Sequence, residues 1–110
     1  MIVEHRSGPI AVIRPAGRLD RLAAPELEAA FSALVAGGNP RLVVDLAAVS
    51  FIDSSGLGAL ISGLGATRRA GGDLRIARLD GHSGALFRLT ALDRVLRLYA
   101  TVEDALAGYG

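Results

Sequence analysis

Residues 51–60 read FIDSSGLGAL, and the organisation of the chain can be worked out from this stretch. Aspartate and serine are residue types that favour the N-terminal end of a helix, and an apolar run of helical length follows at 57–67. Upstream, RLVVDL at 41–46 is a near-continuous aliphatic run, which is typical of a strand covered on both faces. We therefore expect a strand, a connection over 47–52 and a helix over 57–67, with Ser54 or Ser55 at the helix N-terminus.

Strands and helices alternate on both sides of this stretch. Two short β-prone runs at 2–6 and 10–14 flank a Ser-Gly-Pro turn and predict a hairpin. The other expected strands are 73–79 and 95–100, and the other expected helices run from Pro25 to the glycine pair at 37–38, over 84–92, and onward from Thr101 as N-cap. This order predicts an α/β fold with a mixed or mostly parallel sheet flanked by helices.

The composition indicates one ordinary globular domain over residues 1–110. Hydrophobic residues make up 51% of the chain, which argues against disorder, and the net charge of +1 with no basic stripe argues against a nucleic-acid partner. No cysteine is present, so disulfides and thiolate metal sites are excluded. We find no signal peptide and no apolar run long enough to span a membrane, and we expect a cytoplasmic protein.

Three roles are open for the serine pair: a helix cap, a catalytic nucleophile, or a site that another protein modifies. One capping oxygen is enough for a helix, yet Asp53, Ser54 and Ser55 are all capping types. Gly56 and Gly58 lie in or near the first turn, where glycine weakens a helix but leaves the backbone open to another molecule. A helix N-terminus also favours an anion such as a phosphate.

The nucleophile role has little support in the sequence. Neither serine has the Gly-x-Ser-x-Gly surroundings of a nucleophile elbow, and only His5 and His82 could serve as a base. All twelve basic residues are arginine, so the lysine of a phosphate-binding P-loop is missing. Two distant histidines make no metal motif. We expect no catalytic residue, no metal and no cofactor.

Four segments together resemble one known family. They are Gly17-Arg18-Leu19-Asp20, the strand at 42–46, Asp53-Ser54-Ser55-Gly56-Leu57-Gly58, and Leu89-Thr90-Ala91-Leu92-Asp93-Arg94-Val95. In this order and spacing they are similar to a STAS domain, and more narrowly to the stand-alone anti-sigma factor antagonists of bacteria. The resemblance covers nearly the whole chain. It implies a STAS fold, with a mixed four- or five-stranded sheet and helices mainly on one side.

The resemblance also implies a site and its partners. In this family a serine kinase that is also an anti-sigma factor phosphorylates the first hydroxyl residue after the motif aspartate, which is Ser54 here, with Ser55 as second choice. The unmodified form binds the anti-sigma factor and frees the sigma factor, and a PP2C-type phosphatase resets the switch. The implied partner-binding residues are Asp20, Asp53, Ser54, Ser55, Gly56, Leu57 and Gly58.

Three departures or flanking features accompany the resemblance. Ala23-Ala24 precedes Pro25, where a Ser or Thr cap is common in the family, so a weaker start of that helix is expected. Gly63 and Gly65 interrupt the second helix and could serve close packing, loosen the helix or reflect drift. Arg18 and Arg21 flank Asp20 and could tune partner choice or simply be solvated.

Two other functions remain open. Some STAS proteins are accessory subunits of lipid-transporting ABC systems, and others belong to stress-sensing assemblies, so the fold alone leaves the partner undecided. A small hydrolase using Ser54 or Ser55 is the other alternative. The leading interpretation is a protein–protein switch that is not an enzyme.

Overall fold

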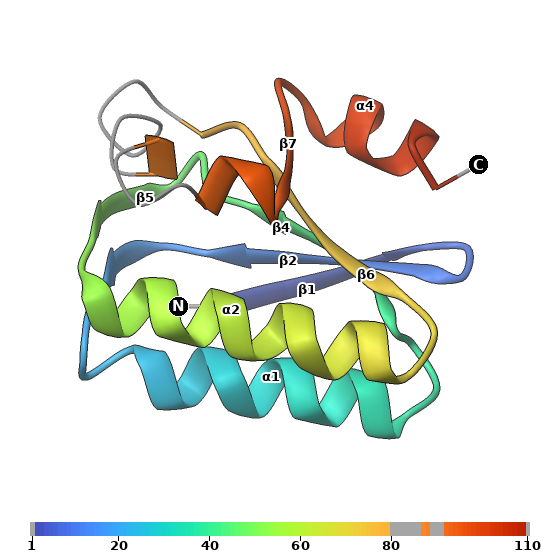
Figure 1. The fold of residues 1–110 in the computed structure, drawn as a ribbon, viewed down its shortest axis with the longest axis horizontal. Coiled ribbons are helices and arrows are strands. Elements are labelled where there is room, and N and C mark those ends of the chain that lie inside the picture. The colour runs from blue at the N-terminus through green and yellow to red at the C-terminus, as the bar shows by residue number, and fades with distance from the viewer. Residues whose placement is uncertain (1, 80–86, 89–91, 110) are drawn as a thin grey trace.

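The computed structural model describes residues 2–79, 87–88 and 92–109. A five-stranded sheet forms its centre, with strand order β1-β2-β4-β6-β7 (Figure 1). The strands are β1 (Ile2–Ser7), β2 (Ile10–Pro15), β4 (Arg41–Asp45), β6 (Asp73–Ala77) and β7 (Arg97–Tyr99). The first two form the expected antiparallel hairpin, and the remaining neighbours pair in parallel. The predicted STAS-like mixed sheet is therefore confirmed.

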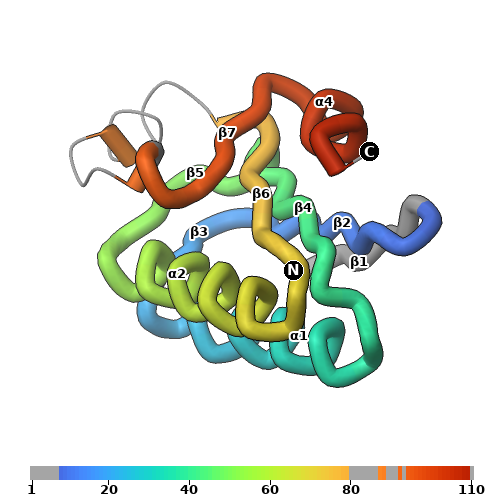
Figure 2. Tube along the Cα trace, turned by 45° about the vertical axis from the view of Figure 1, so that its right-hand side comes forward, coloured from blue at the N-terminus to red at the C-terminus, as the bar shows by residue number. Residues whose placement is uncertain are grey.

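Helices α1 (Ala24–Ala36) and α2 (Ser54–Arg69) cover one face of this sheet (Figures 1 and 2). The period of α1 places Leu27, Phe31 and Leu34 toward the sheet, where they are buried with the aliphatic residues of β4 and β6. This larger core binds the two long helices to the sheet, and it fixes the position of the α2 N-terminus.

The short helix α4 (Val102–Ala107) packs on the opposite face. Val102 and Ala105 are buried there against Val12, Val43 and Ala77 of the central strands. Thr101 caps α4 as expected, because its side chain accepts from the Asp104 amide at 3.0 Å. Because β4 is covered on both faces, its residues 42–45 are buried, as its aliphatic sequence predicts.

The expected connection over 47–52 is wrong in part, since it contains the strand β5 (Val49–Ile52). β5 pairs in parallel with β3 (Gly17–Leu19) to form a separate two-stranded sheet. Val49 and Ile52 are buried, whereas Ser50 is exposed. Four residues are too few for periodicity to reveal such a strand without its partner.

The helix after β5 starts three residues earlier than expected, because α2 begins at Ser54 rather than Leu57. Helix α2 is continuous through Gly63, and glycine there has a packing reason, since a Cβ would overlap the Phe31 ring and the Leu74 side chain. The helix expected over 84–92 lies mostly outside the described residues; Phe87 and Arg88 are helical, and Leu92–Arg94 forms the 3₁₀ helix η1. In the described part of the chain, no helix is long and apolar enough to cross a membrane.

Candidate functional site at the N-terminus of α2

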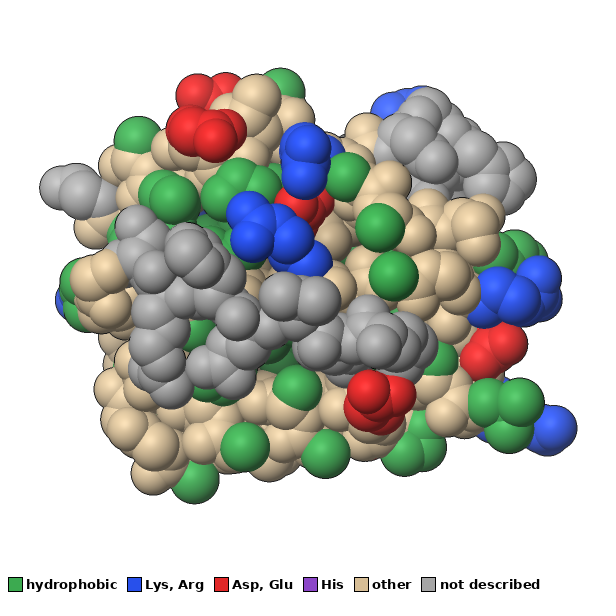
Figure 3. Space-filling model, turned by 180° about the vertical axis from the view of Figure 1, so that it is seen from behind, with side chains coloured by type: hydrophobic (Ala, Val, Ile, Leu, Met, Phe, Trp, Pro, Cys, Tyr) green, Lys and Arg blue, Asp and Glu red, His purple; other side chains and the backbone are tan. Residues whose placement is uncertain are grey.

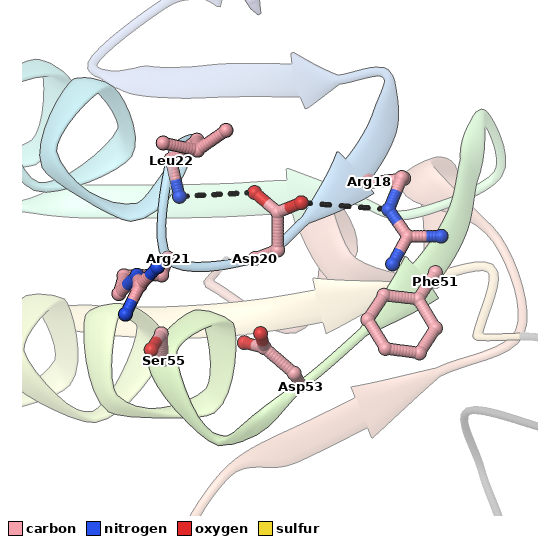
Figure 4. A pocket seen from close by; sticks show the side chains of 7 residues that line it. All are labelled: Arg18, Asp20, Arg21, Leu22, Phe51, Asp53 and Ser55. Carbon is pink, nitrogen blue, oxygen red and sulfur yellow. Dashed lines mark hydrogen bonds and ion pairs between the residues drawn. The ribbon is translucent and has the colours of Figure 1, made fainter.

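The short parallel pair β3–β5 brings Asp20 and Asp53 to the same edge. Leu19 and Ile52 are partners in the register, and each aspartate is the next residue in its chain. The carboxyl ends of parallel strands meet at one edge of a sheet, so the two side chains emerge near one another. Figure 4 shows Asp20 and Asp53 among the side chains that line one hollow.

Asp53 is the N-cap of α2, so of the three capping residue types at 53–55 the aspartate takes this role and neither serine does. Its Oδ1 accepts from the Gly56 amide at 3.0 Å, and its backbone carbonyl accepts from the Leu57 amide at 3.0 Å. The Asp53 amide in turn donates to the Leu19 carbonyl. Aspartate competes well for this position because its charge also interacts favourably with the helix dipole.

Ser54 is therefore the first residue of α2 rather than its cap, and its side chain is exposed. The Ser54 hydroxyl has no hydrogen-bond partner among the residues that the structure describes, so it is not committed to holding the helix. Ser55 is half-buried and lines the hollow with Asp53. The two neighbouring hydroxyls thus differ in accessibility: one faces solvent and the other faces the hollow.

The next three residues of the motif divide between packing and surface. Gly56 is buried, and a Cβ at this position would overlap the Leu19 carbonyl oxygen. Glycine is required here because the first turn of α2 lies directly against β3. Leu57 is buried in the main core. Gly58 is exposed with nothing within 4 Å of a Cβ, and it leaves this part of the helix surface flat.

Asp20 organises the turn that leads into α1. Its Oδ1 accepts from the amides of Leu22 at 3.0 Å and Ala23 at 3.2 Å, and its backbone carbonyl accepts from the Ala24 amide. These bonds substitute for the helix cap that Ala23 cannot supply, so the start expected to be weak is supported by Asp20. The bond from the Ala23 amide, with further help from Leu22 and Arg18, holds the pKa of Asp20 below its ordinary value.

Arg18 connects this turn to β5. Its Nε donates to Asp20 Oδ2 at 3.4 Å, and its guanidinium carbon lies 4.1 Å from the centre of the Phe51 ring. Arg18 and Phe51 are also register partners of the β3–β5 pair. An arginine stacked on an aromatic ring and paired with a carboxylate has a restricted orientation, so the Arg18 side chain forms a defined edge of the site.

These side chains line an open hollow of about 450 Å³, which we call the α2 cleft (Figure 4). The lining residues are Arg18, Asp20, Arg21, Leu22, Phe51, Asp53 and Ser55. Leu22 stands out because its side chain is 86% exposed, more than any other large hydrophobic side chain in the described part of the chain. This leucine gives the cleft one exposed apolar side chain beside its paired charges.

The α2 cleft lacks the parts of a hydrolase among the described residues. Of the two possible bases, His82 and the side chain of His5 lie outside the described residues. No group of three or more metal-ligating side chains occurs in the described part of the chain. The cleft offers two carboxylates and an apolar side chain. The exposed Ser54 hydroxyl lies next to the lining residues Asp53 and Ser55 in the chain, at the helix N-terminus, where modification is possible.

Sequence analysis missed two residues of the α2 cleft, Leu22 and Phe51. A leucine within the polar turn Asp20-Arg21-Leu22 was a usable signal, because turn positions are seldom apolar without a reason. Phe51 lay in the segment taken as a connection, so its pairing with Arg18 could not be anticipated.

Comparison with known proteins identifies the family and the fold of this chain. The STAS domain family model matches residues 1–105. The anti-sigma-F factor antagonist RsfB of Mycobacterium tuberculosis is 34% identical over 111 residues, covering 97% of this chain and 85% of the relative. The crystal structure of an anti-sigma factor antagonist from Mycobacterium paratuberculosis has a TM-score of 0.88 and 31% identity, covering 98% of this chain and 92% of that one.

A further solved structure shows the same fold at lower identity. It is the Bacillus cell fate determinant SpoIIAA in its phosphorylated form, with a TM-score of 0.78, 21% identity and full coverage of both chains. The family match, the relatives and the observed sheet order all agree with the resemblance found in the sequence. This chain belongs to the STAS domain family.

Proposed function

We propose that this chain is an anti-sigma factor antagonist that works as a phosphorylation-controlled protein–protein switch. In its unmodified form it binds an anti-sigma factor through the α2 cleft and so frees the sigma factor. The anti-sigma factor is also a serine kinase, which phosphorylates Ser54 and ends the binding, and a PP2C-type phosphatase restores the unmodified form. The switch operates in the cytoplasm and has no catalytic activity of its own.

The position of Ser54 is the single observation that carries this proposal. Because Asp53 caps α2, Ser54 is exposed and its hydroxyl is not needed for the fold. A phosphate added there would lie at the positive end of a 16-residue helix, which favours an anion. Modification would therefore change the surface while leaving the domain folded.

The charge of the α2 cleft explains how a phosphate would end binding. Asp20, whose pKa lies below its ordinary value, is a carboxylate at neutral pH, and Asp53 adds a second carboxylate at the same edge. A phosphate on Ser54 adds a charge of about −1.5 to −2 beside them. A partner that docks apolar or acidic groups here would meet repulsion and a cost of desolvation, and each loss of about 1.4 kcal/mol weakens binding tenfold.

The relatives support the same conclusion. Two of the reported relatives are named as anti-sigma factor antagonists, and they are matched over nearly the whole of this chain. SpoIIAA, which shares the fold, has a phosphorylated form. The alternative of an accessory subunit in a transport or stress-sensing assembly rests on the shared fold alone.

The proposal is tested with the anti-sigma factor kinase encoded in the same genome, purified and titrated calorimetrically with four forms of the chain. We expect the wild type, Ser54→Ala and Ser55→Ala to bind alike, and Ser54→Asp to bind at least about tenfold more weakly. With ATP present, the wild type and Ser55→Ala should be phosphorylated and Ser54→Ala should not. Equal binding by Ser54→Asp would contradict an electrostatic switch, and phosphorylation of Ser54→Ala would move the site to Ser55.

A further inference from the structure

A second concave surface lies at the far end of α2, along the edge strand β7. This β7 groove has a volume of about 550 Å³ and is lined by Arg68 of α2 and by residues 94–99. Ser54 and Arg68 are fourteen residues apart on α2, which is about 21 Å along the helix axis. The β7 groove is therefore separate from the α2 cleft, and both could be occupied at once.

The β7 groove is strongly basic. Arg68, Arg94 and Arg97 line it, and all three side chains are exposed. Asp73 Oδ1 pairs with Arg68 at 3.2 Å, but Asp73 Oδ2 is shared between Arg75 at 3.3 Å and Arg97 at 3.8 Å. Arg94 has no carboxylate partner among the described side chains. The Asp73 carboxylate is therefore shared among Arg68, Arg75 and Arg97. The groove keeps an excess of positive charge.

The groove also has apolar surface. Val95 is 44% exposed and Leu98 is 36% exposed, and these are two of the four large exposed hydrophobic side chains in the described part of the chain. Arg68 donates to the Val95 carbonyl at 3.1 Å, which fixes the arginine beside this apolar surface. Arginine with apolar neighbours is the composition found at protein interfaces. An edge strand that uses charge only to prevent pairing with other chains would not need exposed apolar side chains.

The backbone of β7 is the third feature. β7 is the last strand in the sheet order, so one of its sides has no strand partner in the described part of the chain. Leu98 is the register partner of Ile76 on the α2 side of the sheet, and Tyr99 is the partner of Ala77 on the α4 side. The groove therefore extends along both faces of β7 and follows its free edge.

From these features we propose that the β7 groove binds an extended acidic segment of a partner protein as a sixth strand. Backbone groups of β7 would pair with the segment, its acidic side chains would meet Arg94 and Arg97, and its apolar side chains would contact Val95 and Leu98. A second copy of this chain is disfavoured, because two β7 edges would bring two sets of arginines together. A nucleic acid would use the arginines but not the strand edge or the apolar side chains.

The probe is a capped, fluorescein-labelled peptide of alternating Glu and Val, Glu-Val-Glu-Val-Glu-Val, titrated into the ¹⁵N-labelled full chain. We expect anisotropy to rise with binding and amide shifts to concentrate at residues 95–99. The double variant Arg94→Glu/Arg97→Glu should weaken binding at least about tenfold. Arg69→Glu is the control, because Arg69 is exposed and lies next to Arg68 in the chain but outside the groove. It makes the same change of charge per site and should have little effect on binding.

Three controls decide between occupants. A peptide with Lys in place of Glu and one with N-methylated backbone amides should both fail to bind, and Leu98→Ser should weaken binding in a chain that still folds. Ser54→Asp should leave peptide binding unchanged, so this result is independent of the proposed switch. The proposal is overturned by amide shifts at 54–58 instead, by equal binding of the N-methylated peptide, by tighter binding of a single-stranded oligonucleotide, or by dimerisation through β7.

Discussion

Among the regions of this domain that pair an aspartate with arginine, two differ clearly in burial. In the α2 cleft, Asp20 is 24% exposed and meets Arg18, which is 62% exposed, at 3.4 Å. On the opposite face of the sheet, Asp45 is 2% exposed and pairs with Arg14 at 3.1 Å and with Arg78 at 2.6 Å. Figure 3, which views the molecule from behind, shows basic side chains gathered around an acidic one. We call the three residues Arg14, Asp45 and Arg78 the Asp45 network.

The difference shows that the same residue types form a network around a buried carboxylate in one place and a more exposed pair in another. Asp45 also accepts from the Ala47 amide at 3.0 Å, so the network ties the ends of β2, β4 and β6 together. Burial would raise the pKa of Asp45, but hydrogen bonds from Arg78, Ala47 and Arg14 outweigh it and hold the pKa below its ordinary value. Asp20 also accepts hydrogen bonds, from the Leu22 and Ala23 amides and from Arg18, but its side chain and that of Arg18 remain partly exposed.

The largest expected effect is the loss of the Asp45 network. Asp45→Ala should lower the free energy of unfolding by about 2–4 kcal/mol, because it removes a buried carboxylate and leaves the Ala47 amide unpaired. Asp20→Ala is the matched variant, and it should lower stability less while weakening binding of the anti-sigma factor more. Urea denaturation and calorimetric titration measure the two quantities. A larger loss of stability in Asp20→Ala would contradict the division of roles.

The second effect separates the two glycines of the motif. Gly56→Ala should lower the free energy of unfolding by about 1–3 kcal/mol, because its methyl group would overlap the Leu19 carbonyl and push α2 from β3. Gly58→Ala should raise it by about 0.5–1 kcal/mol, since the position is helical and open. Equal changes in thermal unfolding would mean that α2 does not approach β3 closely.

Parts of this fold could be predicted from the sequence, and the reasons are local. The hairpin, the doubly covered strand β4, and the Thr101 cap all follow from patterns within a few residues. The segment FIDSSGLGAL correctly predicted a helix, but it could not indicate which of three capping residues would be used. That choice depends on β3, since the Asp53 amide is held by the Leu19 carbonyl.

The candidate site was predicted by residue type but not by arrangement. Asp20 and Asp53 emerge together only because β3 and β5 pair in parallel, and β5 was not recognised. Leu22 and Phe51 were missed for the same reason: their contribution comes from the position of the chain in space. The β7 groove brings Arg68 of α2 together with residues 94–99, and no pattern within one segment of the sequence reveals that these residues lie close in space.

The third effect is a dependence of stability on acid. Asp20 and Asp45 both have a folded pKa below the ordinary value of 3.8. The stability that these two carboxylates contribute is therefore complete above that value, and it is lost as the pH falls through their lower folded pKa. We expect stability in urea to be level near neutral pH and to fall below about pH 4. Asp45→Asn should reduce the loss of stability below about pH 4 more than Asp20→Asn does. An equal reduction would contradict the stronger coupling of the Asp45 network.

The smallest effect on the fold is expected at Leu22. Leu22→Ser should leave the thermal midpoint nearly unchanged, because the side chain is 86% exposed. It should weaken binding of the anti-sigma factor about tenfold or more if the leucine is a buried anchor in the complex. Ile61→Ser, at a less exposed apolar position on α2, is the control. Equal binding by all three forms would place the docking surface elsewhere.

The central claim is that Ser54 is a regulated phosphorylation site, and mapping phosphorylation on the chain isolated from its native cells tests it most directly. The measurement is mass spectrometry of this chain from growing and from stressed cultures, with peptide fragmentation that distinguishes Ser54 from Ser55. The account predicts phosphate on Ser54 with an occupancy that changes between the two conditions. Phosphate confined to Ser55, or none on either serine in both conditions, would contradict it.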